Sequence, residues 1–346
     1  MLISVDYSVL ISQGQCKKLG RRLIELQPNT EDFLDSRLFP SPTYEPEDIA
    51  HFFFFVTGID HRTSPPNQSF EGIVDGEHFQ GADLLWHLSL RKFKANPQWF
   101  HPATMAQITN ETIAEWFTVT SPKEVTVRNP AERAVLLRNS GQLLLDKYQG
   151  SLFNLLSTAN HRVTSDFKNV SPGLLELLSQ FKAYEDPVKK KSYLLLKFLL
   201  RRNLWSIRDS DEVRIPVDNH LTRIALRTGI VKVSTEFAIH LREQQPLSLK
   251  TDVALRKTVG DAYSYVGKFV KRSVLELDDF FWHFGRQCCL RADPICVTGC
   301  TTSCYVVEQL IKVSCQGRCP LSSICLASTN DAKRALVEPK LETWYY

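Results

Sequence analysis

The chain has 346 residues, of which 43% are hydrophobic and 23% are charged, and its formal net charge is +4. This length allows a large core and two packed subdomains, and the composition is ordinary for a globular protein. The longest apolar run, residues 52–56, is far too short to cross a bilayer, and the first 20 residues show no secretory pattern. We therefore expect a cytoplasmic or nuclear protein without membrane contact, in which cysteines stay reduced or bind metal.

The N-terminal part of the chain combines prolines with one apolar run. Residues 1–45 are expected to form an extension, which ends in a proline-rich stretch that disfavours helices. Residues 52–56, Phe-Phe-Phe-Phe-Val, are compatible with a strand or a helix. Glycines and prolines in residues 58–76 predict a loop or hairpin, and residues 81–93 have apolar residues at helical spacing.

Helical spacing dominates the rest of the chain. Predicted helices cover residues 110–117, 130–150, 174–181, 191–202, 217–228, 251–270 and 275–284. Alternation with a period of two residues is rare, so the predicted fold class is mostly α. The expected domains are the extension at 1–45, a helical subdomain at 46–130, a second at 131–228 and a C-terminal segment at 229–346.

One aspartate stands at the start of a predicted helix. Asp218 follows Pro216 and can accept hydrogen bonds from the first free amide groups of the helix. Asp218 can therefore be a simple N-cap. The two roles are compatible, because a carboxylate held rigidly at a helix end can also stabilise positive charge that develops on a substrate.

Cysteines near the C-terminus have a spacing typical of metal ligands. They form the pairs Cys289-x6-Cys296 and Cys319-x5-Cys325. In a chain without secretory features, this favours a metal or iron–sulfur site over disulfides. Four thiolates can bind a [4Fe-4S] cluster or, as the alternative, a zinc ion, and simple packing is the third possibility. Four further cysteines could replace one of these ligands: Cys288, Cys300, Cys304 and Cys315.

A basic stretch lies before Asp218. Residues 182–208 contain eight lysines and arginines and two acidic residues, which leaves a local charge of about +6. Such a concentration of charge favours a polyanion or a phosphate group as partner. The alternative is a solvated helix start.

The C-terminal half resembles the helix–hairpin–helix DNA glycosylases of the endonuclease III superfamily. The resemblance is carried by Val217-Asp218-x-His220-x-x-Arg223 and by the cysteine spacing, with an insertion between Cys296 and Cys319. It implies a two-subdomain helical fold with a C-terminal [4Fe-4S] loop and a catalytic Asp218. It also implies DNA base removal with AP-lyase activity, in which Lys191 forms a Schiff base and Lys190 is the second candidate. The Leu-Pro-Gly-x-Gly hairpin of that family is absent.

The middle of the chain resembles a second family, the queuosine-salvage nucleotide glycosylases, over roughly residues 50–230. The resemblance is carried by Phe54–Thr57, by Glu132–Leu152, by Tyr184-Glu185-Asp186 followed by Lys191, and by Ile215–Arg223. It implies hydrolysis of an N-glycosidic bond in a modified nucleotide or nucleoside. That family lacks the four-cysteine loop.

Residues after the apolar run are candidates for binding a base. Asp60 and His61 can hydrogen-bond to a base edge, and Phe55 and Trp86 can stack on the base. The alternative is that the aromatic residues pack in the core and that Asp60 caps a turn.

The sequence thus predicts a monomeric, mostly α protein that cleaves an N-glycosidic bond. The first interpretation is a DNA glycosylase with lyase activity and a nucleic-acid partner. The alternative is a queuosine-salvage-like nucleotide or nucleoside hydrolase. A third is a catalytically inactive relative that binds nucleic acid.

Overall fold

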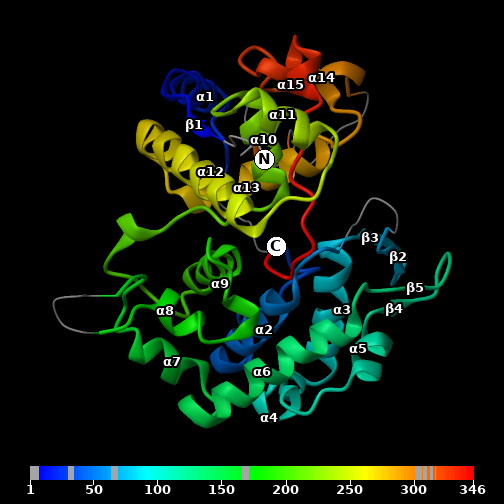
Figure 1. Cartoon of the computed structure of the whole chain (residues 1–346). Helices are drawn as coiled ribbons and strands as arrows, with labels where there is room; N and C mark the ends of the chain where they lie inside the picture. The colour runs from blue at the N-terminus through cyan, green and yellow to red at the C-terminus, as the bar shows by residue number, and fades with distance from the viewer. Residues whose placement is uncertain are drawn as a thin grey trace, which may run out of the picture. The chain divides into compact units, whose positions relative to one another are not determined.

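The computed structural model describes residues 8–29, 35–63, 69–165, 171–300, 306, 310, 311, 315 and 317–346. Within these residues the fold is mostly helical, as predicted, and its short strands form two-stranded antiparallel sheets (Figure 1). Among the described helices, none combines the length and the hydrophobicity that crossing a membrane requires.

The chain divides into two compact units, each built from separate stretches of sequence. The central unit consists of residues 34–213 and 343–346, and the terminal unit consists of residues 1–33 and 214–342. The finer division of the chain at residues 45, 130 and 228 stays a prediction.

The central unit is built around helix α2 (Pro46–Ile59), in which every residue from Ile49 to Ile59 is buried. The run 52–56 is therefore helical, and it is apolar on all sides because other elements surround it. The helices of this unit are α3 (Ala82–Ala95), α4 (Pro102–Met105), α5 (Asn110–Trp116), α6 (Pro130–Tyr148), α7 (Leu152–Thr158), α8 (Leu174–Leu178) and α9 (Lys190–Arg201). Short 3₁₀ helices are η1 (Pro97–Phe100), η2 (Lys182–Tyr184) and η3 (Ser210–Glu212). Helix α2 contacts α3, α6, α7 and α9, so its residues link the whole unit.

Two hairpins complete the central unit. Strand β2 (Glu71–Val74) pairs with β3 (Glu77–Gln80), and β4 (Thr118–Val119) pairs with β5 (Val125–Thr126). The first hairpin turns at Asp75-Gly76, and both residues have positive φ, at 54° and 84°. Aspartate and glycine tolerate this conformation, which matches the twist of the flanking strands.

The terminal unit brings the N-terminal stretch onto the C-terminal helices. Strand β1 (Val9–Ile11) pairs with β6 (Val231–Val233), and α1 (Gln13–Leu26) packs on α12 (Leu249–Val270). A Cβ on Gly20 of α1 would lie 2.5 Å from the ring of Phe269, so glycine permits this close contact. The other helices are α10 (Asn219–Thr228), α11 (Thr235–Arg242), α13 (Val274–Gln287), α14 (Ile295–Thr298), α15 (Asp331–Arg334) and the 3₁₀ helix η5 (Leu326–Ser328).

Candidate functional site

The C-terminal end of α2 is the point where several predicted site residues meet. The helix ends at Ile59, and Asp60 and His61 follow, both buried. The last carbonyl groups of a helix lack partners within the helix and carry a partial negative charge. Donors with positive charge are therefore favoured at this position.

Lys191 is one of these donors. It lies near the start of α9 and is completely buried. Its Nζ donates a hydrogen bond to the carbonyl oxygen of Gly58 at 2.6 Å and lies 3.3 Å from Nδ1 of His61. Burial lowers the pKa of Lys191 well below its ordinary value, and the charges of Lys190 and Arg133 lower it further.

Arg133, in the first turn of α6, is the second donor. It is 1% exposed, and its guanidinium donates to the carbonyl oxygens of Ile59 and His61, the latter at 2.7 Å. The same group lies 3.1 Å from Nε2 of His61. Burial lowers the pKa of Arg133 to about 10, while the charges of Asp60 and Glu132 act in the opposite direction.

His61 sits between these cations and a carboxylate. Its Nε2 lies 3.0 Å from Oε1 of Glu132. Burial lowers the pKa of His61 well below its ordinary value, and Arg133 and Lys191 add to the effect. His61 is therefore a neutral imidazole at neutral pH, and it can donate a hydrogen bond to Glu132.

Asp60 adds a negative charge to these residues at the end of α2. Trp86 donates from Nε1 to its Oδ2 at 3.1 Å, and the aspartate is only 9% exposed. Its charge favours the protonated forms of both Lys191 and Arg133. We call Asp60, His61, Glu132, Arg133 and Lys191 the central charged cluster. It contains two basic and two acidic side chains around one imidazole.

The remaining predicted binding residues of the central unit are also buried. Lys190 is 8% exposed, and its backbone amide donates to Oδ2 of Asp186 at 3.0 Å. Phe55 packs against Phe54 in the core, with ring centroids 5.1 Å apart. Trp86 has its ring in the aromatic core and only its indole N–H in the cluster. Roles of these residues in substrate binding stay predictions.

Asp218 belongs to the terminal unit, whereas Lys191 belongs to the central unit. Asp218 is the N-cap of α10, where its Oδ1 accepts a hydrogen bond from the amide of Leu221 at 2.9 Å. The expected cap is thus confirmed. Its side chain is half-buried rather than sealed in the core.

Of the four predicted metal ligands, Cys289 and Cys319 lie in one hydrophobic cluster of the terminal unit, and the partly buried Cys296 and Cys325 pack against it. Burial raises the pKa of Cys325 to about 12, and the nearby thiols of Cys289 and Cys296 raise it further. Burial also raises the pKa of Cys319, with contributions from the other three thiols. Over the described part of the chain, no group of three or more His, Cys, Asp or Glu residues is arranged to hold a single metal ion.

Of the four further cysteines, three lie in the described residues. Cys288 ends helix α13, and Cys300 donates from its backbone amide to the carbonyl oxygen of Gly317 at 2.8 Å. Cys315 is half-buried. Cys304 lies outside the described residues.

Two arginines of α10 secure the segment around Cys289. Arg227 is 2% exposed and donates to Sγ of Cys289 at 3.5 Å and to the carbonyl oxygen of Arg291 at 2.7 Å. Arg223 donates to the carbonyl oxygen of Cys289 at 2.9 Å and pairs with Glu338 at 2.7 Å. This segment is therefore held by buried, charge-assisted hydrogen bonds.

Sequence reasoning missed Arg133 and Arg227 as site residues. A signal was present for Arg133, because it shares a helical face with Leu136 and Leu137, three and four positions later. Arg227 similarly follows Ile224 by three positions on the buried face of α10. A charged residue on an apolar helical face indicates a buried partner.

Several lysines of the basic stretch at 182–208 are buried, although its composition suggests an exposed basic surface. Lys190, Lys191 and Lys197 are 8%, 0% and 3% exposed. These three residues therefore do not contribute to a basic surface.

Comparison with known proteins identifies a related family. Residues 45–201 match the protein family described as Queuosine salvage protein. No curated protein matches the chain.

This match overturns the first interpretation from sequence. The predicted DNA glycosylase with AP-lyase activity is wrong, and so is its assignment to the helix–hairpin–helix family, because the match is to a different family. The second resemblance is the one supported: over somewhat less than half of its length, at residues 45–201, this chain is similar to the queuosine salvage proteins.

Proposed function

We propose that the protein hydrolyses the N-glycosidic bond of a queuosine-type nucleoside or nucleotide. The observation that carries this proposal is the central charged cluster, which lies inside the stretch that matches the queuosine salvage family. The cluster joins residues from α2, α6 and α9, and each of these segments lies within residues 45–201.

Asp60 has the chemistry to recognise the base. Queuosine is a modified guanine nucleoside, and a guanine edge presents N–H groups that a carboxylate accepts. The hydrogen bond from Trp86 orients the carboxylate, and the neighbouring cations Lys191 and Arg133 compensate its charge. A carboxylate in such a low-dielectric setting is also suited to stabilise a cationic sugar as the base leaves.

Lys191 and Arg133 have a positioning role in this proposal. Both donate to carbonyl groups at the end of α2, so they hold the backbone that carries Asp60 and His61. These contacts hold the backbone at the end of α2, and the acidic groups of the cluster are Asp60 and Glu132.

Asp218 is a separate candidate for the stabilisation of positive charge on the sugar. Its support is its fixed N-cap geometry and its partial exposure. The Asp218→Asn variant keeps an oxygen that can cap α10, so it removes the charge while it preserves the helix start.

The test is release of the free base from queuosine and from its 5′-monophosphate, measured by liquid chromatography. We expect Asp60→Asn to lower turnover at least about a hundredfold, the scale of losing one preorganised electrostatic group. Asp146→Asn, which changes an exposed aspartate of α6, is the matched control and should retain activity. Wild-type protein that releases no base from either substrate would refute the proposal. If Asp218→Asn alone loses turnover, the catalytic carboxylate is Asp218 rather than Asp60.

We propose separately that Cys289, Cys296, Cys319 and Cys325 bind a [4Fe-4S] cluster. The support is the chemistry of the donor set: Cys289 and Cys319 lie in one hydrophobic cluster, Cys296 and Cys325 pack against it, and Arg227 donates a hydrogen bond to Sγ of Cys289. A zinc ion needs its four sulfurs about 2.3 Å from one point, whereas a cubane takes one thiolate at each of four iron corners and so tolerates wider spacing. Bound there, the cluster would supply structural cross-linking of the C-terminal segments.

Anaerobic purification followed by absorbance spectroscopy and metal analysis tests this assignment. Iron, sulfide and the broad charge-transfer absorbance are expected in wild type and should be lost in Cys319→Ser. If the purified protein contains one zinc ion per chain and no iron, the four cysteines bind zinc and the cluster assignment is wrong.

A further inference from the structure

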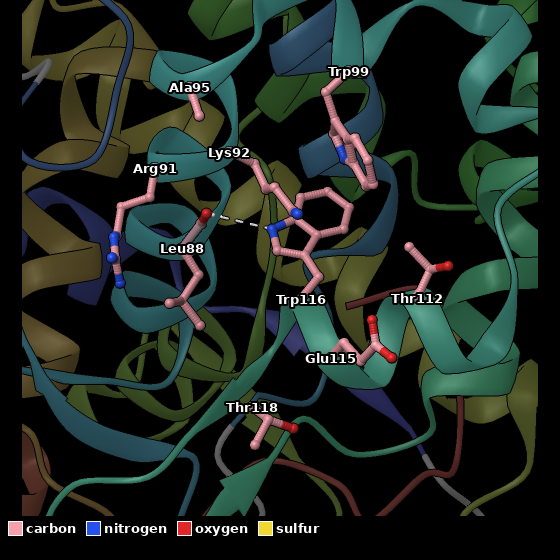
Figure 2. Close-up of a pocket in the computed structure, with 9 residues that line it drawn as sticks. All are labelled: Leu88, Arg91, Lys92, Ala95, Trp99, Thr112, Glu115, Trp116 and Thr118. Atoms are coloured by element: carbon pink, nitrogen blue, oxygen red, sulfur yellow. Dashed lines mark hydrogen bonds between the residues drawn. The ribbon is translucent and has the colours of Figure 1, made fainter.

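The central unit contains a cavity that shares no residue with the central charged cluster. It has a volume of about 400 Å³ and lies among α3, η1, α5 and β4 (Figure 2). Pockets for small organic molecules typically measure about 300–1,000 Å³. The cavity is therefore large enough for a ligand of the size of a mononucleotide.

Two indole rings form aromatic walls of this cavity. The centroids of Trp99 and Trp116 are 6.2 Å apart, and their planes are nearly perpendicular at 84°. Trp116 is held in place, because its Nε1 donates to the carbonyl oxygen of Leu88 at 3.3 Å (Figure 2). Its ring also stacks on that of Phe117. Such faces favour a planar aromatic ring, since bases stack well on indole.

The second indole has an unused donor. Nε1 of Trp99 is buried and makes no hydrogen bond within the described residues. A buried donor without a partner is unfavourable, so a ligand that offers an acceptor gains from binding here. The ring that fits best therefore carries an acceptor atom at its edge, as purines do.

Lys92 is the cation that an anion can meet at this cavity. Arg91 also lines the cavity, but its Nε already lies 3.5 Å from Oδ2 of Asp75, and Glu115 adds a negative charge. Nζ of Lys92 lies 4.3 Å from the ring centroid of Trp99, so a cation already covers this aromatic wall. A second cation would be repelled there, whereas a phosphate would be attracted.

We propose that this cavity is a binding site for a nucleoside monophosphate. The base lies against the indoles with its edge acceptor at Nε1 of Trp99, and the phosphate lies near Lys92. The site is independent of the N-glycosidase proposal, because it uses different residues and requires no bond cleavage.

Isothermal titration with guanosine monophosphate tests the site. Lys92→Met keeps the length of the side chain and removes its charge, and we expect binding to weaken about tenfold, the scale of one charge-assisted contact. Lys94→Met changes an exposed lysine of the same helix outside the cavity, and it should bind as wild type does. Guanosine without phosphate should bind more weakly than the monophosphate and should not respond to Lys92→Met.

Trp99→Phe separates the indole N–H from the aromatic wall. It keeps a ring and a fold that circular dichroism can verify, and we expect several-fold weaker binding because the donor is lost. Equal affinity in wild type, Lys92→Met and Trp99→Phe would overturn the proposal. Binding that is lost only in Asp60→Asn would assign the nucleotide to the central charged cluster, and preferential binding of tetramethylammonium would make the cavity a cation site; either result also overturns it.

Discussion

Nζ of Lys191 and the carbonyl oxygen of Gly58 form a hydrogen bond of 2.6 Å between residues that are 133 positions apart in the chain. The bond joins the start of α9 to the end of α2, and both groups are buried. The bond secures the end of α2, and a catalytic role of Lys191 stays a prediction.

Lys191→Met should therefore destabilise the protein. The change removes the donor and leaves the Gly58 carbonyl oxygen buried without that partner, which typically lowers the free energy of unfolding by about 1–3 kcal/mol. Urea unfolding followed by circular dichroism measures the difference. Lys123→Met, at an exposed position of the β4–β5 hairpin, is the control and should be close to neutral. Equal loss in both variants would contradict the role of the Gly58 bond.

His51 should make the protein sensitive to mild acid. Burial lowers its pKa from 6.5 to about 4, and His101 contributes to this shift, although Glu47 lies 3.4 Å away. Between pH 6.5 and about 4, His51 is protonated in the unfolded state but stays neutral in the folded state. The free energy of unfolding therefore decreases as the pH falls through this range. From pH 7 to pH 5 this group alone lowers the free energy of unfolding by about 2 kcal/mol.

Chemical unfolding of wild type and His51→Gln at the two pH values isolates the effect. Between pH 7 and pH 5, the free energy of unfolding of the variant should fall by about 2 kcal/mol less than that of wild type. His78→Gln, at an exposed histidine, should retain the pH dependence of wild type. Identical pH dependence in wild type and His51→Gln would show that another group is responsible.

Gly141 of α6 should not accept a side chain. An added Cβ would lie 2.5 Å from the backbone nitrogen of Ala106 and 2.6 Å from the carbonyl oxygen of Pro102, and backbone atoms cannot rotate away. Gly141→Ala should therefore lower the melting temperature, with a loss of about 1–3 kcal/mol despite the better helix propensity of alanine.

Gly14 of α1 is the matched control, because a Cβ there would meet nothing within 4 Å. Gly14→Ala should be neutral or stabilising by up to about 1 kcal/mol, since glycine is a poor helix former. If both alanine variants raise the melting temperature, α4 and α6 are not packed as closely as described.

Arg227→Met should reduce the iron content of the purified protein. The guanidinium donates to Sγ of Cys289 and to the backbone of the same segment, so its loss removes both a counter-charge and a positioning contact. Iron analysis per protein chain is the readout, and Arg242→Met, at an exposed arginine of α11, is the control. Full iron retention in Arg227→Met would show that Cys289 is held without this residue.

Local features of the structure followed from the sequence alone. The spacing of apolar residues predicted helices at 191–202, 217–228 and 251–270, where α9, α10 and α12 are found. The N-cap at Asp218 was also predictable, because a capping carboxylate acts on amides only a few residues away. These features depend on neighbours in sequence, and therefore they can be read from it.

The partners of the charged residues were decided by the tertiary structure. Composition suggested an exposed basic stretch at 182–208, yet Lys191 is buried against α2, and Arg133 reaches the same helix end from α6. Periodicity shows which face of a helix is buried, but it does not show which distant carbonyl or carboxylate that face meets. The contacts of Lys191 with Gly58 and of Arg227 with Cys289 exist only once separate segments pack together, so only the folded chain determines them.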